Sequence, residues 1–139
     1  MGIESKHPYY TEAAQQWSRI RDSYKGSDAI KKQGQAYLPK LSGQDKDQYE
    51  AYKLRAMYYN GIERTVKGLI GAVMRIEPIV EAPEKVKEWL GDITGTGIPL
   101  NDFIGYVISE QLLMGRQGIL VDRSDERPYL TGYCTEQIT

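Results

Sequence analysis

The chain has very little of the two residue types that most often bind metals or act as nucleophile and base. Its 139 residues include one cysteine, Cys134, and one histidine, His7. A zinc site made of Cys and His ligands therefore cannot form within one chain, and we expect neither a Cys-His pair nor a Ser-His-Asp triad. We expect His7 to be solvated and Cys134 to be a half-buried strand residue. The sequence predicts no catalytic residue, no bound metal and no cofactor, and hence no enzyme.

Long apolar runs are also missing. Stretches without charge, such as Gly68 to Met74, fall far short of the roughly 20 apolar residues of a membrane helix. The N-terminus lacks the basic and then apolar layout of a secretion signal, and Lys6 stands where a myristoylation site needs Ser or Thr. A hydrophobic share of 40% and a charged share of 27% are typical of a globular protein. We expect one domain over residues 1–139, placed in a reducing cytoplasm during synthesis.

The net charge of −1 leaves no excess of basic residues for wholesale binding to nucleic acid. The charge is unevenly distributed along the chain, however. Residues 1–80 hold 13 Lys or Arg against 9 Asp or Glu, and residues 81–139 hold 5 against 10. This polarity suits a head-to-tail contact between copies of the chain, although both halves can also simply be solvated surfaces.

Hydrophobic periodicity predicts a mainly α fold with a C-terminal β-hairpin, an α+β class. The predicted helices cover about 9–25, 27–33, 45–76, 83–92 and 100–115, and the predicted hairpin covers about 118–134. The stretch 45–76 is either one bent helix or two helices, because Asn60-Gly61 is a strong helix breaker within it.

The segment KGLIGAVMRIEP, residues 67–78, combines a strongly apolar helical pattern with two glycines. Gly68 and Gly71 each cost about 1 kcal/mol relative to Ala in a helix interior. We interpret the segment as the buried end of a long helix, in which the glycines admit a neighbouring element and Pro78 forces the chain to leave the helix.

Three other motifs have a binding interpretation and a structural one. The segment GDITGTGIPLND places glycines before a helix, as phosphate loops do, but no strand precedes it, no GK[ST] follows it and Asp92 and Asp102 would repel phosphate. We favour a structural loop. Two groups of acidic residues could also approach a cation. We favour a structural role for both: the first group suits the first turn of a helix, and the second suits a solvated turn. The groups are Asp45, Asp47 and Glu50, and Asp122, Asp125 and Glu126.

Eleven tyrosines, several of them next to basic residues in KLRAMYYNGIERTVK, can stack on nucleic-acid bases or occupy wet protein interfaces. We favour the interface interpretation. The residues that we expect to be buried in packing or at an interface are Trp17, Tyr58, Tyr59, Gly68, Leu69, Ile70, Gly71 and Phe103.

Three longer phrases occur in a distinctive order. They are AYLPKLSGQDKDQYEAYKLRAMYYNGIERTVKGLIGAVMRIEP, then GTGIPLNDFIGYVISEQLLMGRQGILVDR, then RPYLTGYCTEQIT. Together they resemble the N-terminal part of a portal protein of tailed bacteriophages, in a portal-like family. The resembling phrases cover most of residues 15–139, and none of them is a catalytic motif.

The resemblance implies a structural role in the virion, with assembly in the host cytoplasm. Portal proteins form a dodecameric homo-oligomeric ring at one capsid vertex, through which double-stranded DNA is packaged and ejected. The implied partners are other portal subunits, the major capsid protein, the terminase, a head-completion or adaptor protein, and DNA in the channel. Since portal subunits are several times longer, the chain would correspond to the start of the helical wing region. The alternative is a small, stand-alone helical protein that regulates or binds nucleic acid.

Overall fold

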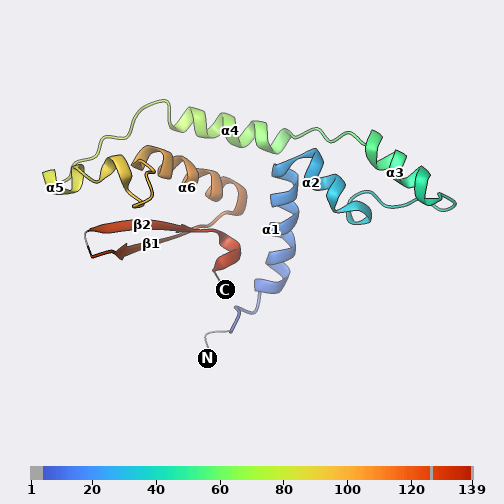
Figure 1. Cartoon of the computed structure of the whole chain (residues 1–139), viewed down its shortest axis with the longest axis horizontal. Helices are drawn as coiled ribbons and strands as arrows, with labels where there is room; N and C mark the ends of the chain where they lie inside the picture. The colour runs from blue at the N-terminus through green and yellow to red at the C-terminus, as the bar shows by residue number, and fades with distance from the viewer. Residues whose placement is uncertain (1–4, 126, 139) are drawn as a thin grey trace.

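The computed structural model describes residues 5–125 and 127–138 and is mainly helical, with a C-terminal antiparallel hairpin, as predicted. The chain is elongated, with α3 and α5 near opposite ends of its long axis (Figure 1). The described residues form six α-helices and two strands. They are α1 (Tyr10–Lys25), α2 (Ser27–Lys32), α3 (Lys46–Arg55), α4 (Gly61–Val73), α5 (Glu84–Lys87), α6 (Leu100–Met114), β1 (Gly118–Arg123) and β2 (Pro128–Tyr133).

The described chain also has three short 3-10 turns, and one of them, η2, replaces the end of a predicted helix. The turn η1 (Gly34–Ala36) follows α2, η2 (Leu90–Asp92) follows α5, and η3 (Thr135–Gln137) follows β2. The helix predicted over 83–92 is therefore only a single turn of α-helix followed by a 3-10 turn. Pro83 precedes its first turn, and the chain closes on itself soon afterwards, with Ile93 N donating to Ile98 O at 2.9 Å.

The predicted helix over 45–76 is two helices, because the chain is extended between Ala56 and Asn60. Asn60 starts α4, since its Oδ1 accepts the Glu63 amide at 3.0 Å. Its Nδ2 also donates to the Tyr24 carbonyl at 2.8 Å and thereby anchors the break to the end of α1. The breaker seen in the sequence is thus a helix cap that also makes a tertiary contact.

The core lies where α1, α4 and α6 meet. It consists of Trp17, Val66, Leu113 and Met114, with half-buried side chains of α1 and α4 around them. The α6 helix ends at Gly115, whose φ of 77° suits a residue without a Cβ. The chain then turns back, so that the hairpin lies beside α6 (Figure 1).

The hairpin packs one face on α6 and leaves β1 open. Gly118 pairs with Tyr133, and Arg123 pairs with Pro128. A Cβ on Gly132 would lie 2.8 Å from Cε1 of Tyr106, so the glycine permits the close approach of β2 to the helix. The Leu130 amide also donates to the Ile93 carbonyl at 2.9 Å, which joins β2 to the loop after η2.

The chain exposes much more surface than its mass requires. Its accessible area is 10286 Å², whereas a compact monomer of the same mass would expose about 7,300 Å². The excess is about 3,000 Å², and it goes with a small core: six hydrophobic residues of the described chain are buried. The elongated chain therefore leaves apolar side chains uncovered that a globular domain would bury.

Candidate functional site

Helix α4 has one wide apolar arc, of which the chain covers only part. Val66 lies in the core with an exposure of 6%, and Ile70 packs beside it. Residues a short rotation away on the same arc are open, with exposures of 46% for Leu69 and 57% for Val73. Ile62 is also exposed at the start of the helix. A helix whose apolar arc is half covered presents the other half to a further partner.

The interpretation of Gly68 and Gly71 as a packing site is wrong for the chain itself. Both glycines are exposed, and no described atom of another element lies within 4 Å of a Cβ built at either position. The physical reason is that the glycines lie on the outward side of α4, away from Val66. Met74 and Pro78 are half-buried, so the end of the helix is covered only in places.

Of the remaining residues that we expected in packing or at an interface, some are buried within the chain and others lie at its surface. Trp17 and Phe103 are buried within the chain, with exposures of 9% and 5%, and so are not available to a partner. Tyr58 is half-buried, whereas Tyr59 is 76% exposed, with its hydroxyl accepting from Arg64 Nη1 at 3.0 Å. The sequence pattern placed these residues on apolar stripes but did not indicate which of them this chain would cover.

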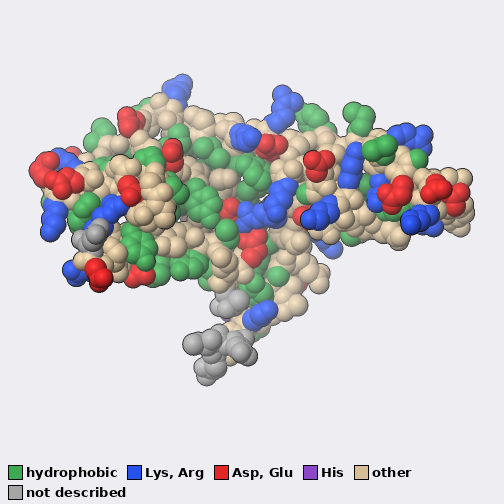
Figure 2. Space-filling model, in the orientation of Figure 1, with side chains coloured by type: hydrophobic (Ala, Val, Ile, Leu, Met, Phe, Trp, Pro, Cys, Tyr) green, Lys and Arg blue, Asp and Glu red, His purple; other side chains and the backbone are tan. Residues whose placement is uncertain are grey.

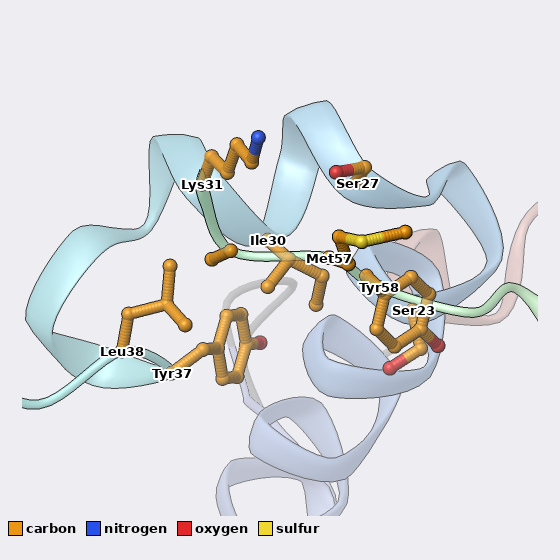
Figure 3. Close-up of a pocket in the computed structure, with 9 residues that line it drawn as sticks. Ser23, Ser27, Ile30, Lys31, Tyr37, Leu38, Met57 and Tyr58 are labelled. Atoms are coloured by element: carbon orange, nitrogen blue, oxygen red, sulfur yellow. The ribbon is translucent and has the colours of Figure 1, made fainter. Parts of the chain in front are cut away.

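A cleft lies between α2, the chain after η1, and the extended segment that leads from α3 to α4 (Figure 3). Its volume is about 260 Å³, below the roughly 300–1,000 Å³ of typical small-molecule sites. Ile30, Leu38 and Met57 supply its apolar wall, and Met57 is 98% exposed. The cleft is therefore sized for one or two apolar side chains.

Polar groups around this cleft are already engaged within the chain. The Tyr37 hydroxyl donates to Asp22 Oδ2 at 2.9 Å, and Lys31 Nζ donates to the Leu54 carbonyl at 2.8 Å. Burial, together with the hydrogen bond to Asp22, raises the pKa of Tyr37. These groups fix the shape of the cleft, and its open wall is apolar.

The strongest cluster of charges joins three distant segments around Arg21. The guanidinium donates two hydrogen bonds to Glu110 at 2.6 and 2.8 Å and two to Glu136 at 2.9 and 3.0 Å. Glu110 is 5% exposed, so its charge requires this partner. The Tyr10 hydroxyl donates to the Glu136 carbonyl at 2.6 Å, which further joins α1 to η3.

The ionisation of this cluster follows from its hydrogen bonds. Those from Arg21 hold the pKa of Glu136 below its usual range, and those to Glu110 and Glu136 raise the pKa of Arg21. Burial is the main cause that raises the pKa of Tyr106, whose hydroxyl lies 3.3 Å from the Cys134 sulfur. The result is a charged network closed on itself, which is suited to holding the C-terminal segment on α1 and α6.

Ligand atoms of Glu110, Cys134 and Glu136 lie within 4.8 Å of one another, a spacing that a metal ion could use. Both carboxylates, however, already bind Arg21 through two hydrogen bonds each. A cation there would have to displace or oppose the guanidinium, so we interpret the cluster as an ion-pair network. Sequence reasoning missed it because Arg21 is 89 and 115 residues away from its partners, and no local spacing marks such a contact.

The glycine-rich segment before α6 is a structural loop, as favoured from the sequence. The Gly97 amide donates to Asp92 Oδ1 at 2.7 Å, and this hydrogen bond is the main cause that lowers the pKa of Asp92. Arg127 Nη2 also donates to Asp92, at 2.5 Å. A carboxylate thus occupies the position that a phosphate would need.

The two acidic groups considered for cations have ordinary local roles where they are described. Asp45 caps α3 through a reciprocal pair with Gln48, at 2.8 and 3.1 Å. Asp122 accepts the Tyr129 hydroxyl at 3.1 Å, and Asp125 is exposed. Glu126 lies outside the described residues.

No protein-family model matches the chain, and no curated protein matches it. Among the described residues, no helix has the length and apolar character needed to cross a membrane.

Proposed function

We propose that the chain is a structural subunit of a phage portal, contributing part of the wing region of the ring at one capsid vertex. The observation that carries the proposal is the surface excess of about 3,000 Å², a size comparable with the about 2,000–5,000 Å² of permanent interfaces. Part of this excess is the open apolar half of α4. The order of phrases that resembles portal proteins supplies the type of assembly.

In this proposal α4 makes contacts on two adjacent faces, one within the chain and one with a neighbouring subunit. Val66 and Ile70 hold the helix on α1 and α6, and Leu69 and Val73 contact a neighbouring subunit. Fully burying one such aliphatic side chain contributes about 1.5–3 kcal/mol. Much of that gain offsets the entropy lost on association, so several subunits closing a ring are needed for a stable structure.

The larger partners follow from the same proposal. A wing subunit would lie at the portal vertex of the virion, beside the major capsid protein, while the assembled ring meets the terminase during packaging and an adaptor afterwards. Double-stranded DNA would pass through the channel of the ring. The chain's own part is to supply subunit contacts, and the proposal gives it no catalytic step.

The test uses two neighbouring residues that face different ways. We expect Leu69→Asp to keep the fold but to lose the assembly, because Leu69 is 46% exposed in the single chain. We expect Ile70→Asp to destabilise the fold itself, because it places a charge beside Val66 in the core. Light scattering measures the mass of each variant, and circular dichroism measures its thermal unfolding.

A wild-type chain that is monomeric at every concentration, or a Leu69→Asp variant that keeps the wild-type mass, would contradict the proposal. Val121→Asp, at a 68% exposed position on β1, is the matched surface control and should leave the mass unchanged. The wild-type oligomer should also dissociate more readily at high salt if opposite charges of neighbouring chains contribute to the contact.

One observation favours the alternative of a small nucleic-acid-binding protein. Tyr59 is 76% exposed, and the Arg64 guanidinium lies 5.8 Å from its ring centroid, a pair that can stack on a base. Titration with single-stranded DNA in low salt distinguishes the two functions. Binding that is lost in Tyr59→Ala would favour the alternative, whereas a portal subunit should show none that depends on this residue.

A further inference from the structure

The two ends of the long axis differ in charge. We call residues 27–58, which include α2, η1 and α3, the arm; they hold six Lys or Arg against four Asp or Glu, a net charge of +2. Residues 77–92, around α5 at the other end, hold two basic against five acidic residues, a net charge of −3. Figure 2 shows a group of acidic side chains at the α5 end, and both basic and acidic side chains along the arm. Opposite charges at opposite ends favour a head-to-tail contact between copies.

The acidic end presents one strongly exposed apolar side chain. In the extended segment after α4, Pro78, Val80 and Ala82 are half-buried, while the residues between them point outward. Ile79 is therefore 91% exposed, with exposed Glu77 and Glu81 on either side. This segment is not loosely attached, because Asn101 Nδ2 donates to Glu77 Oε1 at 2.8 Å. An isoleucine held outward between two carboxylates has the form of an anchor for a basic, apolar cleft.

The arm supplies a cleft of that kind. The cleft under Met57 has an apolar wall, a volume of about 260 Å³ and Lys31 at its edge (Figure 3). Lys32, the next residue on α2, is exposed. An isoleucine side chain fits this volume, and the two lysines match Glu77 and Glu81 in number and sign. Within one chain the anchor and the cleft lie on different parts of the molecule: the anchor follows α4 toward α5, and the cleft lies between α2 and the segment before α4 (Figure 1).

We infer that Ile79 of one copy inserts into the cleft between Ile30, Leu38 and Met57 of the next copy, with Glu77 and Glu81 facing Lys31 and Lys32. The inference rests on the proposed function as a self-assembling subunit and names a second contact of that assembly, in addition to the open face of α4. Because anchor and cleft are different surfaces, the contact is heterologous and repeats from copy to copy.

Engineered cysteines test this pairing directly in the full-length chain, with Cys134→Ser removing the native thiol. One chain carries Ile79→Cys, and a second carries Met57→Cys. A disulfide requires Cα atoms within about 4.4–6.8 Å, so it reports the close approach of two positions. After mild oxidation of the mixture, we expect a linked pair containing one copy of each chain. Neither chain oxidised alone should link to itself efficiently.

Three outcomes would overturn the inference. They are the absence of the mixed pair, equally efficient linkage of either chain with itself, and equally efficient linkage when Val121→Cys replaces Ile79→Cys. If one of these outcomes is found while light scattering shows an oligomer under the same conditions, the inference fails and the proposed function stands. A strictly monomeric chain would contradict both. As a second measurement, Ile79→Asp should weaken self-association at least tenfold and leave thermal unfolding of the monomer unchanged, since this side chain is 91% exposed.

Discussion

The part of the molecule built from α1, α4, α6 and the hairpin, which we call the body, differs sharply from the arm. The body contains the core around Trp17 and the network of Arg21 with Glu110 and Glu136. Among the described residues of the arm, one hydrophobic residue is buried, Tyr49, while Leu54 is 78% exposed and Met57 is 98% exposed. We therefore expect the body to hold most of the stability of the chain, whereas the apolar side chains of the arm are left for another molecule to cover.

The arm is attached by few interactions. Among the described residues, two side-chain hydrogen bonds join it to α1, in which the Tyr37 hydroxyl and Gln33 Nε2 both donate to Asp22 Oδ2, at 2.9 and 3.0 Å. The hydrogen bonds of Tyr49 with Leu38 and of Lys31 with Leu54 lie within the arm itself. Each such hydrogen bond contributes about 0.5–1.5 kcal/mol net. Segments with few buried contacts open locally at low cost, so we expect the arm to open without unfolding the body.

The largest expected effect separates the two regions. Trp17→Ala should lower the free energy of unfolding by about 3–5 kcal/mol, because it leaves a cavity in the core of the body. The matched aromatic substitution in the arm, Tyr49→Ala, should lower global stability by less than about 1 kcal/mol while exposing the α3 amides to exchange. Urea unfolding and hydrogen exchange measure the two effects. Equal losses of global stability would mean that the arm and body unfold together.

The network around Arg21 should have the next largest effect. Arg21→Leu leaves the buried Glu110 without its partner and should cost about 3 kcal/mol, at the lower end of the range for breaking a buried pair. Arg21→Lys keeps the charge but cannot donate two hydrogen bonds to each carboxylate, so it should be intermediate. If all three chains unfold at the same urea concentration, the network does not hold the C-terminal segment in place.

The same network predicts how stability depends on pH. The pKa of Glu136 is lower in the folded chain than its ordinary value of 4.5, so its contribution is complete above that value. The contribution should be lost as pH falls from about 4.5 through the lower folded pKa, because protonation removes the charge that Arg21 binds. Glu136→Gln should flatten this part of the stability profile. If the stability of the wild-type chain does not change between about pH 5 and about pH 3, the ion pair of Glu136 with Arg21 does not contribute to stability as we expect.

The smallest expected effect concerns the two glycines of α4. Since space is open at both positions, Gly68→Ala and Gly71→Ala should each raise monomer stability by up to about 1 kcal/mol. Light scattering of the same variants shows whether a neighbouring subunit needs the space. Stabilised monomers with unchanged assembly would mean that the glycines serve no contact, and destabilised monomers would mean that the helix is packed there after all.

The sequence predicted the helices and strands better than it predicted which of their apolar side chains are buried within the chain. Periodicity located α1, α6 and the hairpin, because each has one apolar stripe or a clear alternation over its whole length. The turn residues Gly26 and Gly115 marked helix ends through their backbone freedom, with φ values of 88° and 77°. Asn60-Gly61 signalled a break, but only the structure showed that Asn60 caps α4.

Burial could not be predicted, because an apolar stripe on a helix can be buried by the same chain or by another molecule and the pattern is the same in both cases. Leu69 and Ile70 are adjacent in one pattern, yet only Ile70 packs on the core of this chain. The Arg21 network was missed for a different reason, since its members are joined by tertiary folding rather than by local spacing. Ile79 looked like part of an ordinary connection, and its exposure of 91% became visible only with the fold.

Hydrogen exchange at increasing protein concentration tests most directly whether the arm and the open face of α4 are completed by another copy. The exchange of α6 amides should be independent of concentration, because α6 is held within the body. The amides of α3, and those of α4, should become more protected as the chains associate. Equal protection of α3 at all concentrations, in a chain whose mass shows assembly, would contradict the account.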